Sequence, residues 1–380
     1  MTSPSGPPQG AGGFPGQPPT QGLPPGGPQQ VPSANGGGLQ NEVHTLERAI
    51  FEVKRIIVGQ DQLVERMLVG LLAKGHVLLE GVPGVAKTLA VETFAKVVGG
   101  TFARIQFTPD LVPTDIVGTR IYRMGKEEFD IELGPAMVNF LLADEINRAP
   151  AKVQSALLEI MAERKISLGG KTFPLPSPFL VMATQNPIEQ EGVYSLPEAQ
   201  RDRFLFKLNV GYPTPEEERE IIYRMGVTPP TPKQILNTGD LLRLQDVAAG
   251  IFVHHALVDY VVRVVTATRE PDKFGMPDAK SWIAYGASPR ASLGIIAASR
   301  ALALIRGRDY VIPQDVVEVI PDVLRHRLVL TYDALADEVS AETVINRIMQ
   351  TVALPQVNAI PQQGHSAAPA MPAAAAAGGR

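Results

Sequence analysis

With 380 residues, the chain is long enough for two folded domains of roughly 100–200 residues each. Hydrophobic residues make up 44% and charged residues 19%, a balance typical of a globular protein with a large core. Because the net charge is -4, the chain lacks the basic excess expected of a nucleic-acid-binding protein, so we expect no nucleic-acid partner. It contains no cysteine, which excludes disulfides and thiolate metal sites.

The sequence predicts no transmembrane segment, since no apolar run approaches the roughly 18–20 residues that span a bilayer. No Lys or Arg precedes Arg48, so the charged start of a secretory signal is also missing. We therefore expect a cytoplasmic protein.

Both ends of the chain have biased compositions. Residues 1–40 are dominated by Pro, Gly and Gln, and residues 354–380 by Ala and Pro. Such segments bury too little apolar surface to offset the entropy of ordering, so we predict a disordered arm and a disordered tail.

Short apolar runs alternate with helical patterns after residue 41. They lie at 76–79, 102–105, 139–142, 179–182 and 204–206. Continuous apolar strands separated by helices are typical of a parallel sheet covered on both faces. We predict an α/β domain at 41–211.

Two hairpins are predicted as insertions in this α/β domain. Residues 119–133 combine a Met-Gly-Lys turn with apolar residues at alternate positions, and residues 166–173 have a Gly-Gly turn. Both patterns indicate two short strands that pair with each other.

The rest of the ordered chain, 212–353, is predicted to be a helical domain. Thr214 and Glu217 form a capping box around Pro215, a favoured first residue of a helix. We expect helices at 215–226, about 241–268, 289–306 and 338–352.

A glycine-rich segment connects the first predicted strand to a helix. In this context the glycines and the helix N-terminus can surround the phosphates of ATP, Lys87 can reach the β- and γ-phosphates, and the Thr88 hydroxyl can bind Mg²⁺. An ordinary strand–helix turn with an incidental lysine is the alternative. The predicted nucleotide-binding residues here are Gly81, Val82, Pro83, Gly84, Val85, Ala86, Lys87, Thr88 and Leu89.

Ala86 departs from the usual G-x-x-x-x-G-K-[ST] pattern, which has glycine at this position. Alanine disfavours left-handed backbone angles. We therefore expect Ala86 to have near-helical, right-handed angles.

Another apolar strand ends in two acids, Asp144 and Glu145. Charges at the end of a buried strand usually have a partner. Asp144 is predicted to hold Mg²⁺ beside Thr88, and Glu145 to orient and deprotonate the attacking water. Solvated acids at an ordinary strand end are the alternative.

Together these motifs resemble the AAA+ ATPases, and within them the MoxR family. The resemblance covers residues 41–353 and includes IVGQ, GVPGVAKT, LLADEINRAPAKVQSALLEIMAE, ATQNP, LPEAQRDRF and GASPRA. It implies a five-stranded parallel P-loop core followed by a smaller all-α lid. It also implies homo-oligomeric rings, typically hexamers, that use ATP and Mg²⁺.

The resemblance assigns further site residues. The segment beside the adenine would be Ile57, Val58, Gly59 and Gln60. Asn186 resembles the polar sensor that positions the water and the γ-phosphate, although an Asn-Pro turn is the alternative.

Two arginines are also assigned by the resemblance. Arg203 matches an arginine finger that acts on a neighbouring subunit, with Arg201 as the nearby competitor and a surface ion pair as the alternative for either. Arg290 matches a lid sensor. Ser288 and Pro289 place it in the first turn of a helix, and we expect it to point back toward the nucleotide crevice. A solvated surface arginine is its alternative.

The resemblance implies an ATPase that remodels, assembles or activates client proteins, or inserts their cofactors, often with a partner that has a von Willebrand factor A domain. The motor subunit of a metal chelatase is an alternative, and so is an ATP-gated scaffold with little turnover. A DNA helicase fits poorly because the chain is acidic.

Overall fold

The computed structural model describes residues 36–82, 84–125, 127–187, 193–226 and 230–356. Most of the predicted arm and tail, and Pro83, lie outside these ranges. Helix α1 (Gly36–Ile56) begins inside the predicted arm, so the prediction of disorder up to residue 40 was wrong for residues 36–40. The physical reason is packing, because Leu39 and Val43 lie against the buried core.

A five-stranded parallel sheet organises the first half of the molecule, in the order β2–β5–β8–β1–β9. All five predicted strands are confirmed, and the fold is α/β as predicted. The strands are β1 (His76–Gly81), β2 (Phe102–Gln106), β5 (Phe140–Asp144), β8 (Leu180–Gln185) and β9 (Phe204–Val210).

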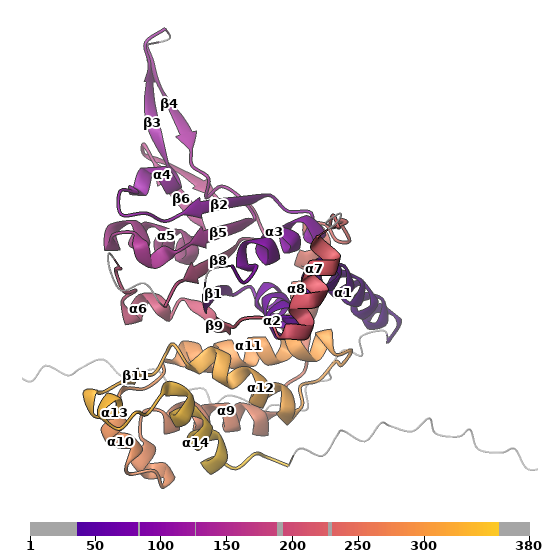
Figure 1. The fold of residues 1–380 in the computed structure, drawn as a ribbon, viewed down its shortest axis with the longest axis vertical. Helices are drawn as coiled ribbons and strands as arrows, with labels where there is room; N and C mark the ends of the chain where they lie inside the picture. Colours follow the sequence, from indigo (N-terminus) through magenta and orange to yellow (C-terminus); the bar gives the residue numbers. More distant parts are fainter. Residues whose placement is uncertain (1–35, 83, 126, 188–192, 227–229, 357–380) are drawn as a thin grey trace, which may run out of the picture.

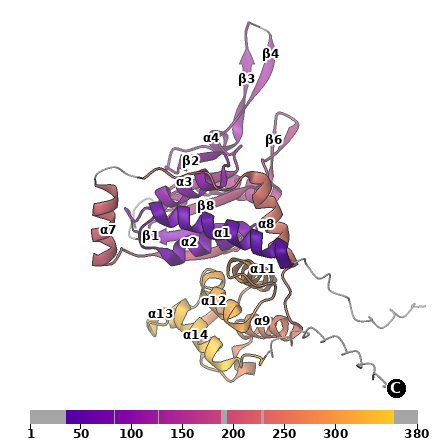
Figure 2. The same cartoon turned by 90° about the vertical axis from the view of Figure 1, so that its right-hand side faces the viewer.

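Helices cover both faces of this sheet (Figures 1 and 2). Successive side chains of a strand point to opposite faces, so Leu79 packs in one buried cluster and Leu78 in the other. The first cluster includes α1, α2 (Asp61–Leu72) and α3 (Lys87–Val98). The second includes α4 (Pro113–Val117) and α5 (Ala151–Glu163), which follows the short turn η1 (Ile146–Arg148).

The two predicted hairpins are confirmed. Strand β3 (Gly118–Arg123) pairs with β4 (Glu128–Leu133), and β6 (Lys165–Leu168) pairs with β7 (Lys171–Pro174), both antiparallel. The β3–β4 hairpin projects far from the core (Figure 1).

Helix α6 (Glu198–Arg201) lies between β8 and β9, whereas α7 (Pro215–Met225) and α8 (Thr238–Gly250) follow the last strand of the sheet. Both α7 and α8 lie beside the core in Figures 1 and 2. Gln245 of α8 donates a 2.7 Å hydrogen bond to the carbonyl of Leu71 in α2. Part of the predicted helical domain therefore packs directly on the α/β layers.

The helix predicted at 241–268 is wrong. The chain forms α8 and then a separate helix, α9 (His255–Ala267). His254 starts the second helix, because its ring accepts a hydrogen bond from the Ala256 N–H. Most of the residues between the two helices are also apolar, so the helical periodicity of apolar residues in the sequence did not reveal the break.

Helix α9 and the remaining elements form a smaller body beneath the sheet (Figure 1). Its helix α12 (Pro313–Leu324) was not predicted, because Pro321 inside the helix disguised the helical pattern. A buried ion pair of 2.8 Å between Arg66 of α2 and Asp322 of α12 holds this body to the core. Its other elements are η2 (Pro271–Phe274), α10 (Ala279–Trp282), β10 (Ile283–Tyr285), α11 (Pro289–Ile305), β11 (Val329–Leu330), α13 (Tyr332–Ala336) and α14 (Ala341–Thr351).

Within the described ranges, no helix has the length and apolar character required to cross a bilayer.

Candidate nucleotide site

The glycine-rich loop lies where the sequence placed it, between β1 and the N-terminus of α3. Lys87, the first residue of α3, donates a 2.6 Å hydrogen bond from Nζ to the carbonyl of Gly81. Gly84 has a φ of 85°, and open space surrounds the position of a Cβ there. A backbone this exposed at a helix N-terminus is suited to bind phosphate oxygens.

Ala86 has left-handed angles, with φ 58° and ψ 21°, so the prediction of right-handed angles was wrong. The loop must turn sharply to start α3 directly at Lys87, and the backbone accepts the Cβ strain at this point. A left-handed residue costs about 1–2 kcal/mol when it is not glycine. Gln60 and Glu145 are also non-glycine residues with positive φ, and strain of this kind is common at functional sites.

The loop lysine and the two acids come together. Burial lowers the pKa of Lys87, and the nearby carboxylates of Asp144 and Glu145 act in the opposite direction. The structure thus brings both acids within electrostatic range of the lysine ammonium, as the sequence predicted.

Asp144 ends strand β5 in a buried position. Its Oδ1 accepts a hydrogen bond of 2.5 Å from the Thr184 hydroxyl, and its Oδ2 accepts bonds of 2.7 and 3.0 Å from the Arg104 guanidinium. Carboxylate and hydroxyl oxygens are the ligands that Mg²⁺ prefers, so Asp144 and Thr88 fit that ion chemically.

Glu145 is held on two sides. Gln106 of β2 donates a 2.7 Å hydrogen bond to its Oε2, and the Arg148 Nε lies 3.2 Å from the same oxygen. Its backbone N–H donates to the Thr184 hydroxyl. The acid predicted to activate water therefore has a fixed position one residue beyond Asp144.

The segment predicted to lie beside the adenine borders the glycine-rich loop. A mainly apolar pocket of about 130 Å³ lies between them, and α7 closes it. Gly59 approaches α7 so closely that a Cβ would lie 2.6 Å from the Glu217 carboxyl. The pocket is lined by Ile56, Ile57, Val58, Gln60, Gly84, Val85, Ala86, Leu89, Pro213, Ile221 and Met225.

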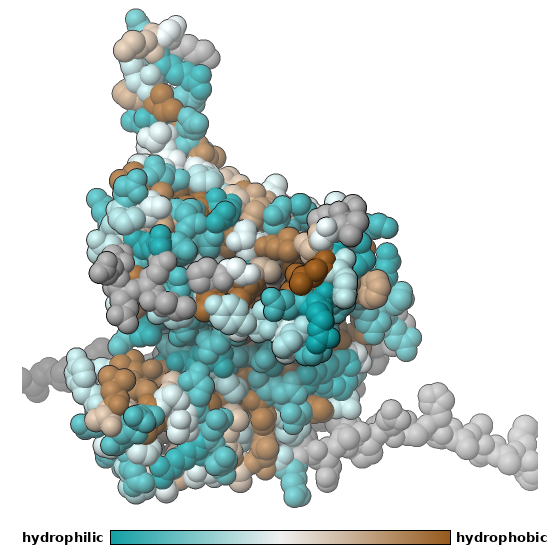
Figure 3. All heavy atoms as spheres, viewed as in Figure 1, coloured by the Kyte–Doolittle hydropathy of each residue, from teal (hydrophilic) through white to brown (hydrophobic). Residues whose placement is uncertain are grey.

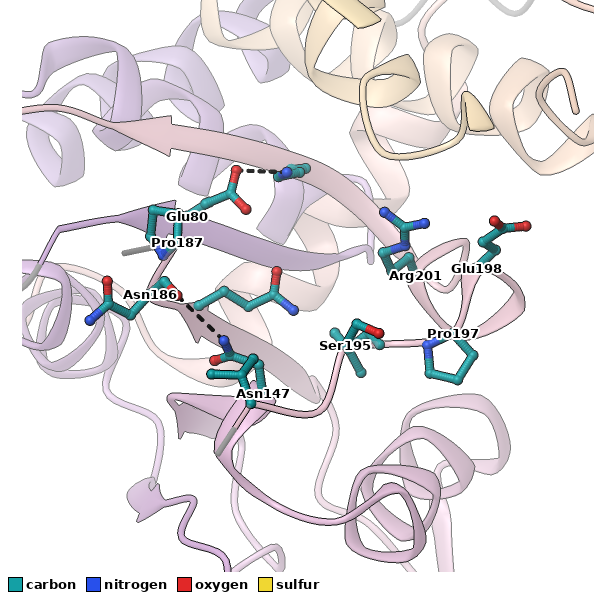
Figure 4. A pocket seen from close by; sticks show the side chains of 12 residues that line it. Glu80, Asn147, Asn186, Pro187, Ser195, Pro197, Glu198 and Arg201 are labelled. Carbon is teal, nitrogen blue, oxygen red and sulfur yellow. Dashed lines mark hydrogen bonds and ion pairs between the residues drawn. The ribbon is translucent and has the colours of Figure 1, made fainter. Parts of the chain in front are cut away.

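Asn186 lies buried directly after β8 and lines a second, polar pocket of about 420 Å³ (Figure 4). The amide of Asn147 donates to its carbonyl at 3.4 Å. Glu80 and Arg201 line the same pocket. Asn186 is thus at the carboxyl edge of the sheet, as predicted.

Arg203 lies at the opposite side of the sheet, where the amino-terminal ends of the strands β1 and β9 meet. It is exposed and precedes Phe204, which pairs with His76 at the start of β1. The glycine-rich loop follows the end of that 6-residue strand. At about 3.3 Å per residue, the two ends of β1 lie roughly 17–20 Å apart.

The prediction that Arg290 points back toward the nucleotide crevice of its own chain was wrong. Arg290 starts α11, as expected, and its side chain is 61% exposed. Its Nη1 lies 3.3 Å from the carboxylate of Asp202, next to Arg203. The docking of the smaller body, which the local sequence does not encode, places it at this edge.

Several polar residues that bond to the site residues were not predicted from the sequence. Arg104 and Gln106 are two residues apart in β2, so their side chains lie on the same face of the strand. Two polar residues with this spacing, in a strand next to the one that ends in the acids, were a signal from which these partners could have been predicted. Asp202 and Arg327, which bond across the two bodies at 2.8 Å, are 125 residues apart and gave no local signal.

Comparison with known proteins agrees with this geometry. Residues 76–206 match the family described as "ATPase family associated with various cellular activities (AAA)", and residues 278–348 match the AAA lid domain. The chain is 79% identical over 385 aligned positions to Chaperone MoxR1 of Mycobacterium tuberculosis, with 100% of both chains covered. The chain belongs to the MoxR family of AAA+ ATPases.

More distant members agree. This MoxR-family chain is 34% identical to Protein MoxR of Paracoccus denitrificans over 293 residues, which cover 73% of this chain and 86% of that protein. A crystal structure of a candidate ATPase from Cytophaga hutchinsonii matches with a TM-score of 0.80 and 43% identity, covering 84% of this chain and 98% of the other. The predicted P-loop core, the lid and the ATPase activity are confirmed.

Proposed function

We propose that this ATPase works as a ring-shaped homo-oligomer, typically a hexamer, in which each ATP lies between two subunits. The observation that supports this proposal is the distance between two groups of candidate residues, the phosphate-binding and acidic residues on one side and the arginines on the other. Lys87 and the two acids lie at the carboxyl edge of the sheet, whereas Arg203 and Arg290 lie at the opposite edge. A single chain cannot bring both groups to one triphosphate.

One subunit supplies the binding half of the site. The loop N–H groups and Lys87 hold the β- and γ-phosphates, and the apolar pocket beside Ile57 holds the adenine. Thr88 and Asp144 would hold Mg²⁺, which would supply positive charge to the phosphates. Glu145 accepts a proton from the attacking water, and Asn186 orients that water.

The adjacent subunit supplies the arginines. Arg203 is exposed at the domain edge, whereas Arg201 is half-buried and faces the polar pocket. This difference supports Arg203 as the finger. Arg290 lies beside it and acts on the same neighbouring γ-phosphate.

Hydrolysis drives chaperone-like remodelling of client proteins in the cytoplasm. The relative at 79% identity carries the name chaperone, which supports this role. The projecting β3–β4 hairpin exposes both hydrophobic and hydrophilic residues (Figure 3), and we propose this surface as the place where a client, or a partner with a von Willebrand factor A domain, binds. Its exposed apolar residues are Ile121, Tyr122, Met124, Phe129 and Leu133.

Nucleotide binding tests the first half of this proposal. Lys87→Ala removes the phosphate-binding ammonium and is expected to abolish binding of a fluorescent ATP analogue. Lys96→Ala is the matched control, because Lys96 lies on the same helix but pairs with Glu92 at the surface. Retained binding by Lys87→Ala, or equal loss in both variants, would contradict the loop assignment.

Client capture tests the second half. The Glu145→Gln protein in ATP is expected to retain a client that Lys87→Ala does not retain, and affinity capture with mass spectrometry identifies it. Purified client should then change conformation or assembly only when wild-type protein hydrolyses ATP. A client processed equally well by Glu145→Gln would contradict the remodelling role.

A further inference from the structure

The carboxylate of Asp202 joins the core to the lid at the edge where the arginines lie. Its Oδ1 accepts a 2.8 Å hydrogen bond from Nε of Arg327. Its Oδ2 accepts bonds from the Ser288 hydroxyl at 2.9 Å and from Nη1 of Arg290 at 3.3 Å. One core carboxylate thus holds together the start of α11 and the segment that directly follows α12.

Arg327 also holds the backbone on both sides of Arg203. Its guanidinium donates to the carbonyl of Asp202 at 3.3 Å, of Phe204 at 2.6 Å and of Leu205 at 3.0 Å. The ring of His326 lies 3.0 Å from the same Phe204 carbonyl. The turn that carries Arg203 is therefore fixed from the lid side.

The contacts between Arg327 and Asp202 are largely buried, so their loss would be costly. The Arg327 side chain is 3% exposed and that of Asp202 16%. A buried guanidinium is costly unless its donors are satisfied, and removal of one partner from such a pair is strongly destabilising to the local arrangement. The core turn and the lid are consequently coupled at this point.

The charge at this edge is unbalanced. Asp202 is shared by Arg327 and Arg290, and Arg203 follows it directly in the chain. One carboxylate cannot neutralise three guanidinium groups, so these four residues together carry a net positive charge. A neighbour's triphosphate is the partner of opposite charge that the proposed ring brings here.

We propose that Arg327 and Asp202 are positioning residues that hold Arg203 and Arg290 as one unit against the nucleotide of the adjacent subunit. This inference rests on the proposed function, because it requires both arginines to act across an interface. Because Asp202 and Arg203 belong to the core and Arg290 and Arg327 to the lid, a movement of the lid relative to the core breaks these bonds and displaces the two arginines relative to each other. The unit thus links lid position to the rate of hydrolysis in the neighbour.

A second buried ion pair provides a matched control. Arg66 and Asp322 also join core and lid, at 2.8 Å and with 4% and 5% side-chain exposure. Within the ranges that the structure describes, the hydrogen bonds and ion pairs of Arg66 and Asp322 go to Glu65, Glu318 and Arg325 and to each other, and none goes to Asp202, Arg203 or Arg290. A purely structural role in lid docking would make both pairs equally important for turnover.

The test compares Arg327→Lys and Asp202→Asn with Arg66→Lys. A displacement of about 1 Å can cost about 10²-fold in rate, so we expect kcat to fall by roughly this factor in the first two variants. KM for ATP and the Kd of a fluorescent analogue should stay within about twofold, because each chain's own binding half is untouched. Arg66→Lys should retain its kcat in folded protein.

A double variant separates positioning from general damage. If Arg327 acts through Arg203, adding Arg327→Lys to Arg203→Ala should lower kcat by less than about threefold further. Multiplicative losses, or an equal loss in Arg66→Lys, would overturn the inference. If Arg327→Lys does not fold by circular dichroism, the half-buried Asp202→Asn takes its place in both comparisons.

The same data distinguish this inference from the proposed function. Wild-type turnover by Arg203→Ala would contradict the shared site itself. Slow turnover by Arg203→Ala, together with normal turnover by Arg327→Lys and Asp202→Asn, would contradict only the positioning unit.

Discussion

The amide of Gln106 donates a 2.7 Å hydrogen bond to the carboxylate of Glu145 across two neighbouring strands of the sheet. The Arg148 guanidinium lies on the same carboxylate oxygen at 3.2 Å. These two contacts fix an acid that is only 25% exposed at the end of β5. A general base needs such a fixed position, because proton transfer requires hydrogen-bond reach to the water.

Replacing this acid should separate binding from hydrolysis. Glu145→Gln keeps the shape and the hydrogen-bonding oxygen but cannot accept a proton, so ATP should bind while phosphate release falls by at least about 10²-fold. Phosphate release and retention of a fluorescent ATP analogue measure the two effects. Glu159→Gln makes the same substitution at an exposed position of α5 and serves as the control. Unreduced phosphate release by Glu145→Gln would remove Glu145 from its role.

The strain at Ala86 predicts a stabilising substitution. Glycine accepts a φ of 58° without a Cβ clash and is a better N-cap than alanine, so Ala86→Gly should raise the free energy of unfolding by about 0.5–1 kcal/mol. Ala90→Gly, one turn later within α3, should instead lower it by about 1 kcal/mol or more. Urea unfolding measures both. A lower free energy of unfolding for Ala86→Gly would show that the left-handed angle is not strained.

The structure also predicts how stability depends on pH. Burial lowers the pKa of His76 from 6.5 to about 4, and burial lowers that of His326 well below its usual value. Below pH 6.5 the unfolded chain therefore binds protons that the folded chain does not, and stability is lost as the pH falls toward about 4. The loss from His76 alone should be on the order of 3 kcal/mol.

Urea unfolding at pH 7.5 and at pH 5 measures this loss. His76→Gln should show a smaller difference between the two pH values than the wild-type protein, because one of the two depressed groups is gone. The same pH difference in both proteins would contradict the assignment of His76 as a buried neutral histidine.

Much of the fold could be predicted because its signals are local. Apolar runs of strand length gave the five strands, and alternation around a turn gave both hairpins. The Thr214–Glu217 capping box gave the start of α7, where both reciprocal hydrogen bonds form. Lys87, Asp144 and Glu145 were predicted for a similar reason, since Asp144 is the last residue of a strand and the other two lie shortly after the carboxyl end of one.

The predictions that failed depend on how a loop closes or on how distant segments pack. The left-handed angle of Ala86 is imposed by the closing of a loop, and alanine's own preference opposes it. The position of Arg290 depends on how the lid docks, which its Ser-Pro-Arg helix start does not specify. Lid docking in turn uses Arg327 and Asp202, and no sequence period connects that pair.

The most direct measurement mixes two inactive proteins. Arg203→Ala lacks the finger but keeps its own nucleotide site, whereas Lys87→Ala cannot bind ATP but keeps the finger. If the site is shared between subunits, each protein alone should hydrolyse ATP slowly, with Arg203→Ala slower than wild type by about 10³-fold. The mixture should regain a measurable fraction of wild-type phosphate release, because some interfaces then hold both halves. A mixture no more active than the sum of its two components, in a sample shown to form mixed oligomers, would contradict the shared site.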